Sequence, residues 1–178
     1  MTLVIFGSAN KNGFTAQLLQ QELRQHRAEY SRPVKFFYCY EQAAAPCSGC
    51  GHCRESGSCR HRDLTDFFRD FSAAQQIIYA FPVYNGSLPA PMKAVVDRFQ
   101  PYYELHFKGQ SPFAAVRPAT LVITAGAKKA TPQPLLQQLR PVFSVTGCRQ
   151  QRCLFLAGTD RPNPHLTVLD KEDRKSVV

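Results

Sequence analysis

The chain has 178 residues, of which 44% are hydrophobic and 20% are charged, and its formal net charge is +9. No apolar stretch approaches the roughly 20 residues of a membrane span, and the basic residues are scattered without forming the continuous face that nucleic acid requires. The start, "MTLVIFGSAN", is typical of a first strand and not of a signal peptide. We therefore expect one globular domain over residues 1–178, cytoplasmic, with no membrane or nucleic-acid partner.

Short apolar runs alternate with amphipathic segments along the chain. Five runs have the near-continuous hydrophobicity of strands that are buried on both faces of a parallel sheet. They lie at residues 3–7, 34–40, 76–82, 119–125 and 153–158. Between them, the spacing of apolar residues predicts helices over residues 15–26, 92–103 and 131–143, with Pro141 ending or kinking the last. This alternation predicts a doubly wound α/β sandwich whose ligands bind where the strands end.

The loop between the first strand and the first helix reads "GSANKNGFT" (residues 7–15). Its glycines allow backbone N–H groups to converge at the start of a helix, which is a common anion site. The loop lacks the GK[ST] of a Walker A motif, and no GxGxxG occurs in the chain. An ordinary tight turn is the alternative, but the position directly after the first strand favours a phosphate loop. Its side-chain donors are Ser8, Asn10, Asn12 and Thr15.

Four of the seven cysteines lie within the stretch "CSGCGHCRESGSC", with the spacing C-x2-C-x2-C-x5-C. They are Cys47, Cys50, Cys53 and Cys59. In a reducing compartment such a group indicates metal binding or redox chemistry more than disulfides. A [4Fe–4S] cluster and reduced free thiols both remain open. Zinc is less favoured, because structural zinc sites usually draw two pairs from separated knuckles. Cys39, Cys148 and Cys153 fall in or beside predicted strands, so we expect them to be buried.

The segment after the third strand reads "PVYNGSLPAPMKAVVDRF". Tyr84 offers a flat aromatic surface, and Asn85 and Ser87 offer hydrogen-bonding groups, as the edge of a planar heterocycle requires. Packing of Tyr84 in the core is the alternative.

Taken in this order, "GSANKNGFTAQLL", "PCSGCGHCRESGSC" and "PVYNGSLPAPMKAVVDRF" resemble the NAD(P)H-dependent FMN reductases, in the branch that includes the iron–sulfur flavoproteins. The resemblance covers about residues 1–158. It implies a flavodoxin-like fold, a three-layer α/β/α sandwich around a five-stranded parallel sheet of order 2-1-3-4-5, with FMN bound at the edge where the strands end.

The resemblance also implies a set of site residues. Those at the phosphate would be Ser8, Asn10, Asn12, Gly13, Phe14 and Thr15. Those at the flavin ring would be Pro82, Val83, Tyr84, Asn85, Gly86 and Ser87, with Thr124, Ala125 and Gly126 as a third contact. This chain has Asn10 where the family usually has an arginine. Either Lys11 replaces the charge of that arginine, or the backbone amides of the loop are sufficient to hold the phosphate.

The function implied is that of an oxidoreductase that takes a hydride from NAD(P)H onto FMN and passes electrons to a small-molecule or protein acceptor. No side chain is assigned a catalytic role, because the flavin carries the chemistry. Cys47, Cys50, Cys53 and Cys59 would be the ligands of a cluster. Two alternatives are an FMN electron carrier, against which the net charge of +9 weighs, and a flavin-free redox or metal sensor.

We also expect a homodimer, because relatives commonly dimerise and the helix from Met92 continues into further aromatic residues. These are Phe99, Tyr102, Tyr103 and Phe107. The tail after Gly158 is expected to form a final helix.

Overall fold

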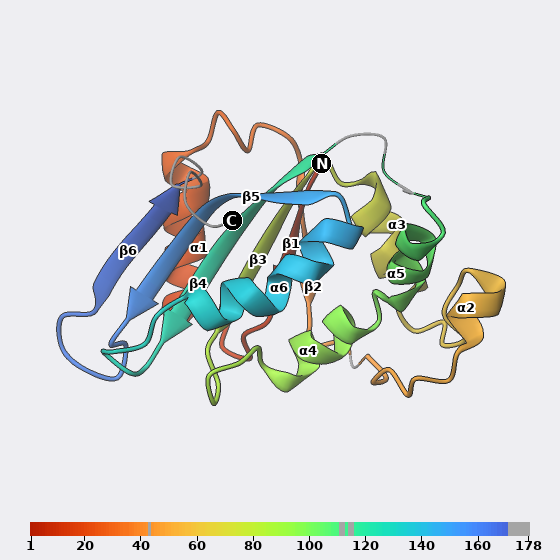
Figure 1. Ribbon diagram of the computed structural model, residues 1–178. Helices are drawn as coiled ribbons and strands as arrows, with labels where there is room; N and C mark the ends of the chain where they lie inside the picture. The colour runs from red at the N-terminus through yellow and green to blue at the C-terminus, as the bar shows by residue number, and fades with distance from the viewer. Residues whose placement is uncertain (43, 111–112, 114–115, 171–178) are drawn as a thin grey trace.

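The computed structural model describes residues 1–42, 44–110, 113 and 116–170. The described strands form one six-stranded sheet of order β2-β1-β3-β4-β5-β6 (Figure 1). They are β1 (Thr2–Phe6), β2 (Val34–Tyr38), β3 (Gln76–Pro82), β4 (Arg117–Ala125), β5 (Cys148–Ala157) and β6 (His165–Asp170). The first five are parallel in the predicted order, which confirms the flavodoxin-like sheet, and β6 adds an antiparallel edge.

Helices cover both faces of the sheet. They are α1 (Phe14–Gln25), α2 (His52–Ser56), α3 (Thr65–Ala73), α4 (Ala90–Asp97), α5 (Gln100–Phe107) and α6 (Gln133–Val145). Helix α1 lies alone behind the sheet, whereas α3 to α6 lie on the opposite side and α2 stands outside this layer (Figure 1). Of the helices described, none is both long and apolar enough to cross a bilayer.

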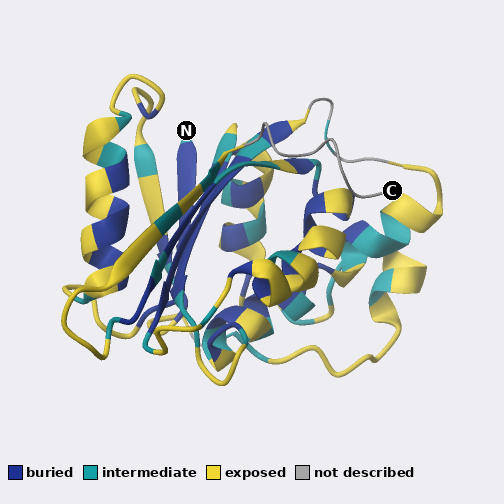
Figure 2. Ribbon diagram, turned by 60° about the vertical axis from the view of Figure 1, so that its left-hand side comes forward, coloured by how far each residue is buried: buried dark blue, intermediate teal, exposed yellow. Residues whose placement is uncertain are grey.

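Two apolar clusters, one on each face of the sheet, make up the core. Along β1, Leu3 and Ile5 face the layer of α3 to α6, whereas Val4 and Phe6 face α1. Because both faces are covered, most residues of the central strands β1, β3 and β4 are buried (Figure 2). This double burial explains why the strands are near-continuous apolar runs in the sequence.

The predicted helix over residues 92–103 is two helices. Helix α4 ends at Asp97, and α5 begins at Gln100 after a break at Arg98 and Phe99. Pro101 lies in the first turn of α5, where the N–H that proline lacks would have had no partner within the helix. The sequence signal for a new helix start was therefore present in this proline.

Pro141 was predicted to end or kink the last helix, and the first of these outcomes is wrong, because α6 continues past it to Val145. The proline removes one backbone hydrogen bond, at a cost of about 3 kcal/mol. Leu139, Val142 and Phe143 are all buried on the inner face of α6. Burial of three large apolar side chains, at about 2 kcal/mol each, outweighs that cost.

The tail was expected to form a helix, but its described part forms the strand β6, which ends at Asp170. Residues 171–178 lie outside the described residues. Leu166 and Val168 alternate with polar residues and pair with Leu156 and Leu154 of β5. Arg152 Nε also donates to Asp170 Oδ1 at 3.2 Å. The alternation has the period of a strand, and an open edge at β5 offers it a hydrogen-bonding partner.

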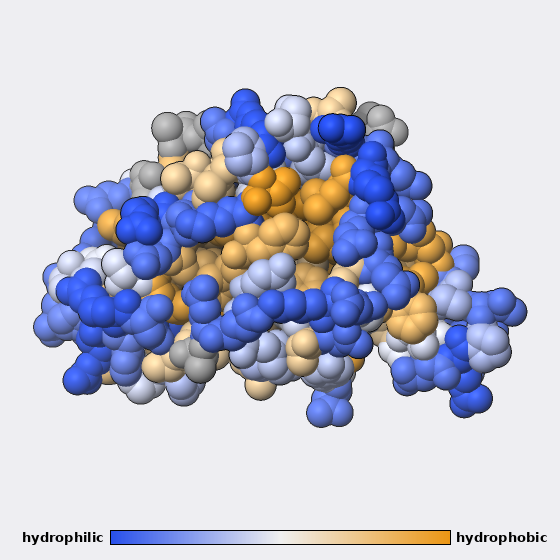
Figure 3. Space-filling model, turned by 180° about the vertical axis from the view of Figure 1, so that it is seen from behind, coloured by the Kyte–Doolittle hydropathy of each residue, from blue (hydrophilic) through white to orange (hydrophobic). Residues whose placement is uncertain are grey.

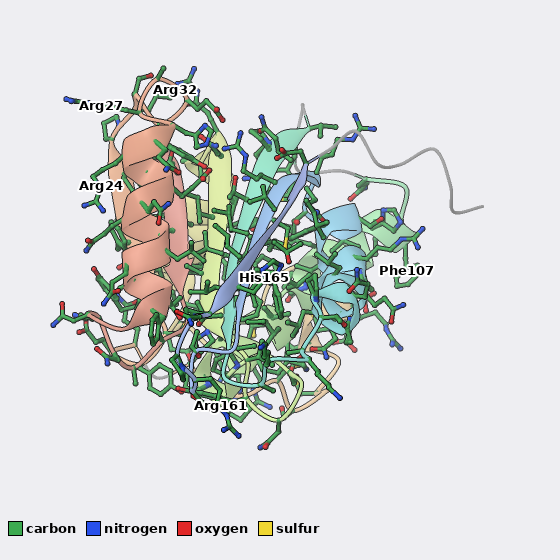
Figure 4. All side chains as sticks on the ribbon, turned by 90° about the vertical axis from the view of Figure 1, so that its left-hand side faces the viewer. Arg24, Arg27, Arg32, Phe107, Arg161 and His165 are labelled. Atoms are coloured by element: carbon green, nitrogen blue, oxygen red, sulfur yellow. The ribbon has the colours of Figure 1, made fainter. Side chains whose placement is uncertain are left out.

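The aromatic residues of α5 mostly pack inside the molecule. Phe99 and Tyr102 are 0% and 8% exposed and contact Phe71 of α3. Phe107, by contrast, is 79% exposed and projects outward, away from α1 (Figure 4). Three of the four aromatic residues that suggested a dimer are thus buried or partly buried within one chain.

Apolar surface remains on the side of the sheet that α1 covers. Seen from behind, an apolar area is framed by hydrophilic residues (Figure 3). Among the exposed apolar side chains on this side of the sheet are Phe36 of β2 and Val168 of β6, since they pair with Val4 and Leu154. Helix α1 is too narrow to cover this face of all six strands, so part of the face stays exposed.

Candidate flavin site and cysteine loop

Three loops meet at the edge where the parallel strands end, the lower edge in Figure 1. They are the phosphate loop after β1 (residues 7–15), the segment after β3 and the third loop after β4 (residues 124–130). Gly7 N donates to Ala80 O at 2.8 Å, and Val83 N donates to Thr124 O at 2.7 Å. The hydroxyls of Thr15 and Thr124 lie 2.7 Å apart in a buried hydrogen bond. The fold therefore brings the residues predicted for the flavin site to one edge.

Polar side chains shape the backbone of the phosphate loop. Asn10 N donates to Ser8 Oγ at 3.2 Å, and Asn12 N donates to Asn10 Oδ1 at 2.9 Å. Gly13 precedes α1 in an extended conformation, and no side chain caps this helix. The N–H groups of its first turn, together with the positive end of the helix dipole, therefore suit an anion such as a terminal phosphate.

Lys11 is already paired. Its ammonium group forms a salt bridge with Glu41 and lies 4.0 Å from the centre of the Tyr38 ring. The structure thus does not support Lys11 as a replacement for the family arginine at Asn10. Of the two sources of phosphate contacts expected at this loop, the backbone N–H groups remain available.

The ring turn (Tyr84–Ser87) is a tight hairpin that follows β3. Tyr84 and Ser87 exchange two backbone hydrogen bonds of 3.0 and 3.1 Å. Asn85 and Gly86 have φ values of 50° and 73°, as the favoured two-residue hairpin turn requires. Tyr84 is 49% exposed, so the alternative that it packs in the core is wrong. Ser87 Oγ donates to Gln138 Oε1 of α6 at 3.0 Å, which anchors the turn.

The third loop is held by the segment after β5. Thr159 N donates to Ala125 O at 3.0 Å. A Cβ atom on Gly126 would lie 2.1 Å from Asp160 Oδ2, so the carboxylate approaches this loop closely. No sequence motif marks Asp160, and its place beside the third loop was not predicted.

The cysteine loop (residues 47–59, including α2) leaves the sheet after β2 and lies beside α5 (Figure 1). Gly49 and Gly51 have φ values of 64° and 76°, which allow its sharp turns. A pocket of about 420 Å³ lies between this loop and the segment from Asp97 to Glu104. All four cysteines of the motif line it: Cys47, Cys50, Cys53 and Cys59.

The four thiols differ in their surroundings. Cys47 and Cys50 are exposed, whereas Cys53 and Cys59 are partly buried. The His52 backbone N–H lowers the pKa of the Cys50 thiol, and Arg60 acts in the same direction. Burial raises the pKa of the Cys53 thiol, and the charge of Glu104 adds to this.

The four sulfurs line one pocket without converging on a common centre. Among the described residues, no three His, Cys, Asp or Glu side chains converge closely enough to hold one metal ion. Zinc holds its thiolates at about 2.3 Å around one centre. A [4Fe–4S] cluster takes them at four separate irons, so thiols spread around the wall of one pocket suit it.

Arg98 closes the inner wall of this pocket and was not singled out from the sequence. It follows α4, and its side chain is 1% exposed. Its Nη2 and Nη1 donate to the two carboxylate oxygens of Asp63 at 2.7 and 3.1 Å. Its Nε donates to Cys59 Sγ at 3.1 Å. The Arg98 guanidinium lowers the pKa of the Asp63 carboxyl to about 2.

The other three cysteines are buried, as predicted: Cys39, Cys148 and Cys153. Burial raises the pKa of Cys39 and of Cys153 to about 12. They are neutral packing residues at physiological pH and take no part in the site.

The fold is flavodoxin-like, with a candidate anion site on the first loop and a separate, thiol-lined pocket at the cysteine loop. A family model described as NADPH-dependent FMN reductase matches residues 1–160. The chain therefore belongs to the NADPH-dependent FMN reductase family. This membership confirms the resemblance seen in the three motifs and the class of oxidoreductase that it implied.

Two relatives of this chain are iron–sulfur flavoproteins by name. An iron–sulfur flavoprotein of Methanosarcina thermophila is 41% identical over 58 residues, which is 32% of this chain and 30% of that protein. One of Methanocaldococcus jannaschii is 32% identical over 98 residues, 54% of this chain and 50% of that protein. The matched parts thus span half or less of the length of these relatives.

Solved structures show the same fold. An NAD(P)H:quinone oxidoreductase from Methanothermobacter marburgensis superposes with a TM-score of 0.68 at 15% identity, covering 88% of this chain and 84% of that one. An azoreductase from Bacillus anthracis superposes with a TM-score of 0.63 at 10% identity, covering 88% and 86%. At such identities the likeness concerns the fold alone.

Proposed function

We propose that this chain is an FMN-dependent oxidoreductase that takes a hydride from NAD(P)H and passes the electrons to a small-molecule or protein acceptor. The observation that carries the proposal is the meeting of the phosphate loop, the ring turn and the third loop at one sheet edge, beside a helix with no side-chain cap. FMN, when bound, supplies the hydride and electron chemistry, and the protein supplies binding and orientation.

Each loop has its own task in this proposal. The N–H groups at the start of α1 hold the phosphate, because the side chains of Ser8 and Asn10 already form hydrogen bonds with the loop backbone. The ring turn presents Tyr84 to the isoalloxazine from a rigid hairpin. The hydrogen bond between Thr15 and Thr124 keeps the phosphate loop and the third loop in fixed relative positions.

We expect the protein to bind FMN in preference to FAD, because the first loop offers one helix N-terminus for one terminal phosphate. A fluorescence titration of flavin-free protein with each flavin measures this. Equal affinity for both flavins, or none for either, would contradict the proposed site.

Tyr84→Ala is expected to weaken FMN binding about tenfold or more, since an aromatic contact with a planar base contributes about 1–3 kcal/mol. The thermal midpoint should stay unchanged, because Tyr84 is 49% exposed and lies in a turn. Phe107→Ala removes another exposed aromatic side chain, far from the three loops (Figure 4), and serves as the matched control. Unfolding of Tyr84→Ala, or equal FMN affinity in both variants, would contradict the assignment.

We propose further that Cys47, Cys50, Cys53 and Cys59 hold a [4Fe–4S] cluster that takes electrons from the reduced flavin. The support is that all four thiols line one pocket and that the relatives matched above are iron–sulfur flavoproteins by name. Iron and acid-labile sulfide per chain, measured after anaerobic purification, test this. Near-zero iron would leave reduced thiols as the state of the loop.

We propose that the protein is a homodimer, as family resemblance implies. The support is the apolar area beside α1 (Figure 3). The aromatic residues of α5 mostly pack within the chain and do not contribute to this support. Light scattering at micromolar concentration should give twice the chain mass of 20.0 kDa. A mass of one chain would overturn it.

A further inference from the structure

Arg98 lies at the end of the helix that runs from the ring turn to the cysteine pocket. Helix α4 begins at Ala90, shortly after the ring turn, and its C-terminal end carries Arg98 at the wall of the cysteine pocket. At about 1.5 Å per residue, its eight residues span about 12 Å. The start of α4 is fixed against the phosphate loop, where a Cβ on Gly7 would lie 2.6 Å from Met92 Sδ. Arg98 is therefore held on a short, firmly packed helix.

The guanidinium ties together the two ends of the cysteine loop. Arg98 Nη1 donates to Ala45 O at 2.8 Å, and Nη2 donates to His61 O at 3.1 Å. Ala45 N in turn donates to Asp63 Oδ2 at 2.7 Å, and Asp63 is the carboxylate that pairs with Arg98. Residues 45 and 61–63 thus meet at a single buried cation. Since the cation is 1% exposed, these partners replace water completely.

The remaining donor of the guanidinium points at sulfur. Arg98 Nε lies 3.1 Å from Cys59 Sγ, while both Nη groups are occupied by Asp63 and backbone carbonyls. The fork shape of arginine lets one side chain make all these bonds, which a lysine does not reproduce. Hydrogen bonds to ligand sulfurs are among the factors that set the reduction potential of an iron–sulfur cluster.

We propose that Arg98 is a positioning residue: it holds the cysteine loop ready for its cluster and, through Cys59, raises the reduction potential of that cluster. The first half concerns the metal-free chain alone. The second half rests on the proposed function. An N–H group directed at the sulfur stabilises negative charge there, and the reduced cluster carries one more negative charge than the oxidised one.

Hydrogen exchange of the full-length, metal-free protein tests the first half. In Arg98→Met, amides of residues 45–63 should exchange about tenfold faster or more than in the parent, which corresponds to about 1.4 kcal/mol of lost protection. Arg69→Met removes an arginine with an exposed side chain on α3, outside this pocket, and should leave the exchange unchanged. Unchanged exchange in Arg98→Met, or an equal rise in both variants, overturns the positioning role. Should Arg98→Met not fold, Asp63→Asn gives the same test, since Asp63 binds both Arg98 and the backbone N–H of Ala45.

The midpoint potential of the anaerobically loaded protein tests the second half. We expect it to fall in Arg98→Met and in Arg98→Lys, which keeps the charge but lacks the forked donors, and to stay in place in Arg69→Met. A potential that is unchanged in both Arg98 variants, or that falls equally in Arg69→Met, overturns the role of the bond to Cys59. Absence of iron from the parent protein would instead overturn the proposed cluster, and with it this second half, while the exchange measurement still decides the first.

Discussion

Cys53→Ser is expected to remove about four iron atoms per chain while FMN stays bound. Cys53 lies on α2 and lines the cysteine pocket, so its thiolate is one of four that would hold the cluster. A serine hydroxyl is a much poorer iron ligand than a thiolate. The flavin loops lie at the sheet edge, outside the cysteine loop, so their geometry does not depend on this thiol.

Iron, sulfide and FMN per chain, measured on anaerobically purified protein, give the result. Cys148→Ala is the matched control, because Cys148 is buried at the start of β5 and has no place in the pocket. It should keep both the iron and the flavin. Full iron content in Cys53→Ser would show that this cysteine is not a ligand. Loss of FMN together with iron would show that the two sites are not separate.

Gly7→Ala is expected to lower the free energy of unfolding by about 2 kcal/mol, the typical cost of overpacking a filled core. The added Cβ would lie 2.6 Å from Met92 Sδ and 3.1 Å from the Cβ atoms of Met92 and Phe81. Met92 and Phe81 are both 0% exposed, so neither has room to retreat. Since Gly7 begins the phosphate loop, FMN affinity should fall as well.

A double-mutant cycle by chemical denaturation identifies the cause. In a Met92→Ala background, the space beside Gly7 is open, and Gly7→Ala should cost less than half of what it costs in the parent. An equal cost in both backgrounds would contradict the contact with Met92 and place the effect in the backbone.

The sheet could be predicted because its burial leaves a direct mark on the sequence. Residues 77–82 are apolar throughout, since Ile77 to Phe81 are buried on both faces, and the loops that follow such strands necessarily share one edge. The break after α4 has a local mark in Pro101, which lies in the first turn of α5. The course of α6 through Pro141 has none, because it depends on how much apolar surface the surrounding elements bury.

The candidate site was predictable where its residues are neighbours in the chain. The phosphate loop, the ring turn and the cysteine motif are each continuous, and each appears as a pattern. Arg98 and Asp160 act through contacts with segments more than 30 residues away, Asp63 and Gly126 respectively. Such pairs exist only after folding, and a lone arginine or aspartate has no spacing that marks it.

The most direct test of the proposed function is an anaerobic titration of the FMN-loaded protein with NADPH and NADH, followed by absorption spectroscopy. We expect at least one of the two nucleotides to bleach the oxidised flavin, with oxidised nucleotide formed in proportion to the electrons taken up. Bound FMN that neither nucleotide reduces would contradict the reductase and indicate an electron carrier.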